Sequence, residues 1–374
     1  MSRVVISCYG REDNPHYGGG GAVVVREVAR CLSRKHEVVV VSGSFAGCRP
    51  EPAEPFQRIY LPVGWAGPRA GKLLFDLRLA QAARRIRHDL WIESVTSPFS
   101  ASFVPFVTAQ PVVALVQTLT AEDMTRRYTI PSGFIERQGL ARYQRVIVSN
   151  EADGDLITRG RRDVSCTVIP HGVDLPDEPP PPGAGQHILF LGRIDVDQKG
   201  LDLLLAAVAL AKPELPVLVA GAGRPTEERK LVGLIEQTRG PVARIGHVSG
   251  PAKDALLRDC AFMVLPSRYE TFGLSALEAM AWGKPVVHFN LPRLQWMGDE
   301  AAIGVPALDV ESLAAAIRGL ATDDVQRASM GRAARGTAER HSWTDIGERY
   351  LDIVDTCLRV TAGHHRPGMP TAQA

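Results

Sequence analysis

Residues 264–288 decide how the second half of the chain folds, and they read VLPSRYETFGLSALEAMAWGKPVVH. The apolar run at the start of this stretch predicts a short buried strand, and the polar segment 266–273 predicts a loop. Residues 274–282 place apolar side chains at helical spacing, and a Gly-Lys-Pro sequence at 283–285 ends that helix. The apolar run 286–289 is the next strand. Strand, helix and strand of these lengths form one crossover of a parallel sheet.

Two carboxylates lie inside this crossover. Glu270 is in the loop after the first strand, and Glu278 is eight positions later in the helix. Ligands of open parallel sheets bind beyond the carboxyl ends of the strands. The backbone N–H groups of Phe272, Gly273 and Leu274 begin the helix, where unpaired N–H groups attract anions. The stretch therefore offers acceptors for sugar hydroxyls and a cradle for phosphate, although the spacing alone also fits two solvated surface glutamates.

The pattern Glu270-x7-Glu278, with Phe-Gly-Leu between the two glutamates and Gly-x-Pro-Val-Val after them, resembles the signature of family 4 glycosyltransferases. The resemblance extends over roughly residues 3–358. It implies a retaining, nucleotide-sugar-dependent enzyme of GT-B architecture, in which two Rossmann-like α/β domains face each other across a cleft. It also implies that the N-terminal domain binds the acceptor and the C-terminal domain binds the donor.

The length of 374 residues suits two domains better than one core. Both halves alternate apolar strands with helices, which predicts two parallel sheets. We expect an acceptor-binding domain at 1–174, a linker at 175–186 that is rich in proline, and a donor-binding domain at 187–342. The resemblance implies that a helix at 343–360 packs back on the first domain, and residues 361–374 have the composition of a disordered tail.

The sequence predicts definite bounds for some helices and strands and not for others. The second half opens with a strand at 187–191, a helix at 201–211 and a strand at 217–220. Asn150 is a suitable N-cap for a helix that starts after it. Residues 42–70, rich in Gly, Pro and Ala, are expected to be irregular, and the alternating pattern loosens after Phe289.

Composition excludes several classes of protein. The formal charge of +2 and the 45% apolar content are ordinary for a soluble globular chain and demand neither nucleic acid nor an anionic membrane as a partner. The six cysteines form no CxxC pair, which favours free thiols in a reducing compartment. No apolar run approaches the ~20 residues of a membrane span, and the chain begins directly with a strand rather than a signal peptide. We therefore expect a cytoplasmic protein without a transmembrane segment.

The cations of the predicted donor site lie in another loop. Arg193 and Lys199 bracket a loop between a strand end and a helix start, where two cations can converge on a diphosphate or, alternatively, remain surface charges. The resemblance makes them the residues that bind the diphosphate. It also implies that Glu278 binds the ribose hydroxyls, that Glu270 contacts the sugar, and that Val248 contacts the donor.

The first domain contributes a glycine run at 18–21 and a departure from the family pattern. Glycines let a backbone approach a ligand closely, and the resemblance places Gly19 and Gly20 opposite the donor sugar. The family commonly has a histidine after the strand that ends at Val116, where this chain has Gln117. A glutamine supplies a carbonyl and one side-chain hydrogen bond but no charge, so the choice of sugar and activity itself are open at this position.

Asp195 and Asp197 form an Asp-x-Asp sequence of the kind that binds manganese in a different glycosyltransferase fold. Two carboxylates are too few for an octahedral ion, and Arg193 and Lys199 already offer positive charge. We expect a solvated loop, hydrogen-bonded to Lys199, with no metal and no cofactor.

The predicted function is retaining, metal-independent transfer of a sugar from a UDP- or GDP-sugar to an unidentified acceptor, which is a small molecule, a glycan or a lipid-linked molecule. The alternatives are a sugar-nucleotide epimerase and a non-catalytic partner protein that binds nucleotide sugars.

Overall fold

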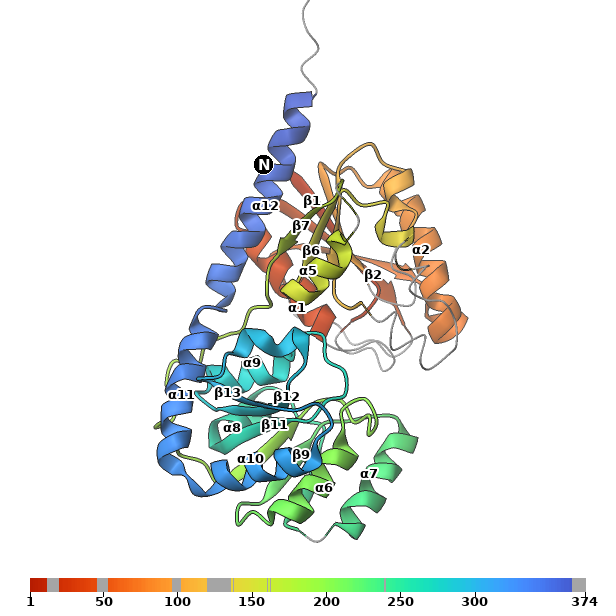
Figure 1. The fold of residues 1–374 in the computed structure, drawn as a ribbon. Helices are drawn as coiled ribbons and strands as arrows, with labels where there is room; N and C mark the ends of the chain where they lie inside the picture. Colours follow the sequence, from red (N-terminus) through yellow and green to blue (C-terminus); the bar gives the residue numbers. More distant parts are fainter. Residues whose placement is uncertain are drawn as a thin grey trace, which may run out of the picture. The chain divides into compact units, whose positions relative to one another are not determined.

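The computed structural model describes residues 1–11, 20–45, 53–95, 102–119, 136, 138–159, 161, 163–238 and 240–364. The chain divides into two compact units (Figure 1). The first consists of Met1–Gly172 together with Trp343–Ala374, and the second consists of Val173–Ser342. The chain therefore leaves the first unit and returns to it.

The first unit is built on a parallel sheet with the strand order β3-β2-β1-β4-β5-β6-β7. Its strands are β1 Arg3–Cys8, β2 Glu37–Ser44, β3 Gln57–Pro62, β4 Leu90–Val95, β5 Val112–Val116, β6 Arg145–Val148 and β7 Ser165–Val168. Its described helices are α1 Gly20–Leu32, α2 Gly67–Arg85, α5 Glu151–Thr158 and α12 Trp343–His364, with short 3-10 helices η1 Gly64–Ala66 and η2 Val104–Phe106. The central strands read as continuous apolar runs because helices cover both faces of a parallel sheet.

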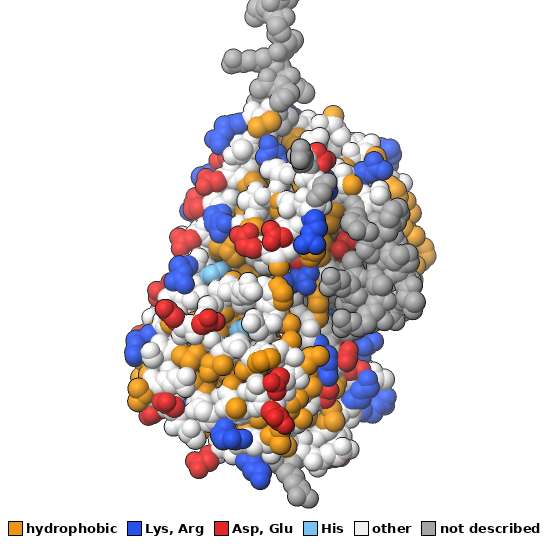
Figure 2. All heavy atoms as spheres, viewed as in Figure 1, with side chains coloured by type: hydrophobic (Ala, Val, Ile, Leu, Met, Phe, Trp, Pro, Cys, Tyr) orange, Lys and Arg blue, Asp and Glu red, His pale blue; other side chains and the backbone are white. Residues whose placement is uncertain are grey.

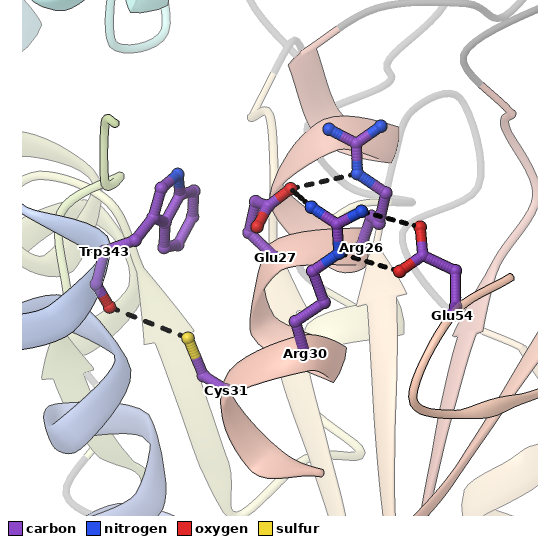
Figure 3. Close-up of polar contacts among 6 residues, drawn as sticks. All are labelled: Arg26, Glu27, Arg30, Cys31, Glu54 and Trp343. Atoms are coloured by element: carbon purple, nitrogen blue, oxygen red, sulfur yellow. Dashed lines mark hydrogen bonds and ion pairs between the residues drawn. The ribbon is translucent and has the colours of Figure 1, made fainter. Parts of the chain in front are cut away.

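The C-terminal helix α12 packs against α1, although the two are more than 300 residues apart. The Cys31 thiol donates to the Trp343 carbonyl oxygen at 3.6 Å (Figure 3). A Cβ atom at Gly347 would lie only 2.5 Å from the Cys31 sulfur, so glycine permits this close approach. Further along α1, Glu27 and Glu54 hold Arg30 from two sides, and this fixes the segment before β3 on the helix (Figure 3).

The second unit has a parallel sheet with the order β10-β9-β8-β11-β12-β13. Its strands are β8 His187–Leu191, β9 Val217–Ala220, β10 Val242–Gly246, β11 Cys260–Leu265, β12 Val286–Phe289 and β13 Ala302–Val305. Its described helices are α6 Leu201–Ala211, α7 Pro225–Gln237, α8 Pro251–Asp259, α9 Leu274–Ala281, α10 Val310–Thr322 and α11 Asp324–Glu339, with the 3-10 helix η3 Pro292–Met297. Two large apolar clusters, one on each side of the sheet, form its core.

Both sheets have the doubly wound arrangement, so the prediction of two Rossmann-like units is confirmed. In each sheet the order reverses between two central strands, β1 and β4 in the first unit and β8 and β11 in the second. Crevices for ligands form at such reversal points, beyond the carboxyl ends of the strands. The second unit thus positions the loops after β8 and β11 for a site.

One prediction about elements is wrong, and one strand was not predicted. The described parts of residues 42–70 are largely regular, because β2 continues to Ser44, β3 lies within the segment and α2 begins at Gly67, while residues 46–52 lie outside the described residues. Strand β3 is at an edge and mostly half-exposed, so its residues lack the apolar run of a buried strand. Strand β13 is also an edge strand that the sequence pattern missed.

The C-terminal end of the chain also differs from the prediction. Helix α12 continues to His364, past the predicted start of the tail at residue 361, and the rest of the predicted tail lies outside the described residues. Among the described helices, none combines the length and apolarity needed to cross a bilayer. On the face shown in Figure 2, acidic and basic side chains are interspersed rather than gathered by sign.

Candidate functional site

An ion pair joins the loops that follow β8 and β11. Lys199 Nζ lies 2.6 Å from Glu270 Oε2, and the side chains are 15% and 10% exposed. The Ser267 hydroxyl donates to the same carboxylate oxygen at 3.1 Å. Because β8 and β11 are the strands where the sheet order reverses, the pair occupies the point where this fold forms a crevice.

Arg268 fastens the same two loops together. Its backbone N–H donates to the Gln198 carbonyl oxygen at 3.0 Å, and its guanidinium donates to the Asp197 carbonyl oxygen at 2.8 Å. The guanidinium also binds both carboxylate oxygens of Asp202 at 2.7 Å. Burial alone would raise the pKa of Asp202, but the hydrogen bonds and charge of Arg268 leave that pKa lowered. Asp202 therefore stays ionised and the fork-shaped contact persists at neutral pH.

Arg193 and Lys199 flank the loop after β8, and their side chains bind different partners. Arg193 is exposed and donates to the Gln198 side-chain oxygen at 2.7 Å. The Lys199 backbone N–H donates to the Asp195 carbonyl oxygen at 2.9 Å, while the Lys199 ammonium binds Glu270. The Asp195 carboxylate instead accepts from the Gln198 N–H at 3.0 Å, and the Asp197 side chain is 76% exposed.

Helix α9 begins at Leu274, the residue at which the sequence predicted a helix to start. Gly273 is the N-cap, with φ of 83°, a left-handed conformation that glycine adopts without steric cost. A Cβ atom there would also lie 3.2 Å from Leu265 and 3.3 Å from Leu294. Within the described residues, the N–H groups of Gly273 and Leu274 have no acceptor, as expected at a helix N-terminus.

Glu278 lies on α9 and forms an ion pair with Lys253 of α8 at 2.8 Å. Both side chains are about one-third exposed, at 32% and 30%, so solvent and ligands reach them. Val248, in the loop after β10, is partly buried against the apolar cluster beneath this site. A ligand hydroxyl that binds Glu278 would have to compete with Lys253.

In the first unit, Gln117 follows β5 and is only 6% exposed. Its Nε2 has no hydrogen-bond partner within the described part of the chain. A Cβ atom at Gly21 would lie 3.5 to 3.6 Å from its side chain, so the start of α1 and the end of β5 are neighbours. Gly20 is the first residue of α1, whereas Gly19 lies outside the described residues.

The sequence analysis did not predict three residues that contact the candidate site: Arg268, Lys253 and Trp296. The Trp296 indole N–H donates to the Phe272 carbonyl oxygen at 2.8 Å. Arg268 is inside the quoted stretch, but its partner Asp202 is 66 residues away in the sequence, so no local pattern indicated the contact. No sequence pattern indicated a role for Trp296, because its partner Phe272 is 24 residues away in the chain. In the described ranges, no three His, Cys, Asp or Glu side chains gather as a metal site would require.

Comparison with known families then identifies the chain. The family model described as “Glycosyltransferase Family 4” matches residues 18–176, and the one described as “Glycosyl transferases group 1” matches residues 185–323. The chain belongs to glycosyltransferase family 4. It is therefore an enzyme of the glycosyltransferase class, as the signature around Glu270 and Glu278 predicted.

Among curated relatives, the glycosyltransferase is 30% identical over 263 residues to a phosphatidyl-myo-inositol mannosyltransferase from Mycolicibacterium smegmatis. The match covers 66% of this chain and 65% of the relative, slightly less than two-thirds of that protein's length.

Two solved structures share the fold. Sucrose-phosphate synthase from Thermosynechococcus elongatus has a TM-score of 0.81 at 20% identity, covering 97% of this chain and 100% of that one. Anabaena HepE, solved in complex with UDP and glucose, has a TM-score of 0.75 at 16% identity, covering 95% and 100%. The glycosyltransferase thus has the GT-B fold.

Proposed function

We propose that this glycosyltransferase moves a sugar from a nucleotide diphosphate, UDP or GDP, to an acceptor hydroxyl, with retention at the anomeric carbon and without a metal. The observation that carries the proposal is the Lys199–Glu270 pair at the reversal point of the second sheet, next to the open N–H groups that begin α9. A cation, a carboxylate and an anion cradle are the groups that a sugar diphosphate needs.

The chemistry concerns the charge on the leaving group. When the sugar–phosphate bond breaks, negative charge grows on the diphosphate and must be stabilised in the transition state. In the proposed complex, Lys199 exchanges Glu270 for the diphosphate, and Glu270 becomes an acceptor for sugar hydroxyls. The amides at Gly273 and Leu274 and the exposed Arg193 add further positive potential. These groups supply the charge that a divalent ion would otherwise supply.

The remaining assignments complete the donor. Glu278 is proposed to bind the ribose hydroxyls, Val248 to contact the nucleotide, and Gln117 to face the sugar, with its Nε2 available for a hydroxyl. HepE binds UDP, which supports a uridine donor. Cys8, Cys31, Cys166, Cys260 and Cys357 form no disulfide among the described residues, which supports the cytoplasm as the place of action.

The test is donor binding by a Glu278→Ala variant. We expect it to weaken UDP or GDP binding by roughly 1.5–3 kcal/mol, the range for a hydrogen bond to a charged group. The free nucleotide should lose as much affinity as the nucleotide sugar, because the contact is to ribose. Calorimetric titration of both ligands measures this.

Lys253→Met is the matched control, since it breaks the same ion pair but keeps the Glu278 carboxylate. Equal losses of nucleotide affinity in both variants would show that the Lys253–Glu278 ion pair matters rather than a ribose contact. That result would refute the assignment of Glu278 to the ribose. Product analysis with the donor alone detects epimerisation, and hydrolysis of the donor by water in excess EDTA tests cleavage of the sugar–phosphate bond. Activity that disappears in EDTA and returns with Mg²⁺ would contradict the metal-free proposal. An epimerised donor as the product would mean that the enzyme is an epimerase rather than a transferase.

A further inference from the structure

Trp296 holds the peptide that leads into α9. Its indole stacks on the Phe272 ring, with centroids 4.6 Å apart and planes 3° from parallel. Its Nε1–H donates to the Phe272 carbonyl oxygen at 2.8 Å. Phe272 is 1% exposed and Trp296 is half-buried, so the Phe272 side of both contacts is shielded from water. One side chain, carried by η3 after β12, thus fixes both the ring and the backbone of Phe272.

The planarity of the peptide bond transmits this constraint to the cradle. The Phe272 carbonyl and the Gly273 N–H belong to one trans peptide unit, so they point in opposite directions. A carbonyl held on the indole therefore aims the Gly273 N–H away from Trp296. Gly273 itself does not impose that direction, because glycine has the widest range of backbone torsions.

His341 limits the freedom of the indole. Its ring lies 5.2 Å from the Trp296 ring and 6.2 Å from the Phe272 ring, centroid to centroid. The His341 ring is itself anchored, with Nδ1 2.8 Å from the Thr337 carbonyl oxygen. The three rings form a packed support behind the peptide that precedes α9.

We propose that Trp296 is a positioning residue for sugar transfer. It touches no substrate, but it orients the Gly273 N–H toward the diphosphate before the donor binds. The inference rests on the proposed function, which places the diphosphate at this helix start. An N–H group that is already oriented needs no reorientation when negative charge develops on the diphosphate. Losing that orientation therefore destabilises the transition state more than the ground state.

The experiment compares Trp296→Phe with Trp282→Phe. The first variant keeps an aromatic ring for stacking and removes the N–H donor. The second makes the same substitution at the other end of α9, where Trp282 is the C-cap. Both proteins are titrated with UDP and uridine and with GDP and guanosine, and kcat and KM are measured with the matching sugar donor.

We expect Trp296→Phe to weaken diphosphate binding about 5- to 30-fold, to leave the nucleoside unchanged, and to lower kcat more than it raises KM. Trp282→Phe should leave both affinities, kcat and KM at the wild-type level. Equal losses for diphosphate and nucleoside, or equal effects in the two variants, would make Trp296 a merely structural residue and overturn the inference. If instead the wild type binds no nucleoside diphosphate, the proposed function fails first, and that result is distinct.

Discussion

A single buried carboxyl makes the stability of the first unit depend on pH. Glu93 of β4 accepts hydrogen bonds from Tyr143 at 2.8 Å and Ser102 at 2.9 Å. Burial raises the pKa of Glu93 from 4.5 to about 7, although both hydrogen bonds oppose the rise. The folded state therefore holds this proton more tightly than the unfolded state does, so the contribution of Glu93 to stability falls as the pH rises from about 4.5 through 7.

Glu93→Gln should remove this dependence, because a neutral amide still accepts from both hydroxyls. At pH 8 we expect the variant to exceed the wild type in free energy of unfolding by up to about 3 kcal/mol, and at pH 5 by less than about 1 kcal/mol. Urea denaturation between pH 5 and 8 measures the difference. Glu37→Gln, at a side chain that is 58% exposed, is the control and should follow the wild type. The same pH slope in Glu93→Gln and wild type would refute the assignment.

At the scale of elements, Arg268 links the loop after β11 to the loop and helix after β8. Arg268→Lys keeps the charge but loses the fork that binds Asp202 and the Asp197 carbonyl. We expect kcat/KM to fall about tenfold, since displaced catalytic groups are costly, while thermal stability changes little because the pair is partly exposed.

Arg335→Lys is the matched control for this change. Arg335 also combines one carboxylate, Glu339, with two backbone carbonyl oxygens, but it lies on α11. Steady-state kinetics and thermal unfolding of both variants separate the two effects. A drop in kcat/KM shared by both would mean that Arg268 has no special part in aligning Lys199 and Glu270.

At the scale of the whole molecule, the last helix belongs to the unit that the first strand begins. Gly347→Ala should force α12 away from Cys31 of α1 and lower the free energy of unfolding by about 1–3 kcal/mol, the cost of overpacking. Gly336→Ala makes the same substitution in α11, where nothing lies near the new Cβ, and should stabilise by about 0.4–1 kcal/mol. Chemical denaturation measures the change in free energy of unfolding for both variants. If Gly347→Ala stabilises the protein, the close contact between α12 and Cys31 is contradicted.

The sequence by itself determined the elements whose pattern is local. The strand at 187–191, the helix at 201–211 and the strand at 217–220 have the predicted bounds, because each is an uninterrupted apolar or periodic segment. Asn150 caps α5 as predicted, accepting from the Asp153 N–H at 2.9 Å, because a cap involves only residues of its own turn. The signature around Glu270 likewise predicted the family, because its residues are contiguous in the chain.

Only the tertiary structure decided which distant residues meet. Lys199 and Glu270 are 71 residues apart, and they pair because the sheet order makes β8 and β11 neighbours. The edge strands β3 and β13 exist through pairing with β2 and β12 rather than through their own pattern. Trp296 reaches Phe272 for the same reason: a local pattern specifies an element, whereas a contact between loops depends on the order in which the sheet arranges its strands.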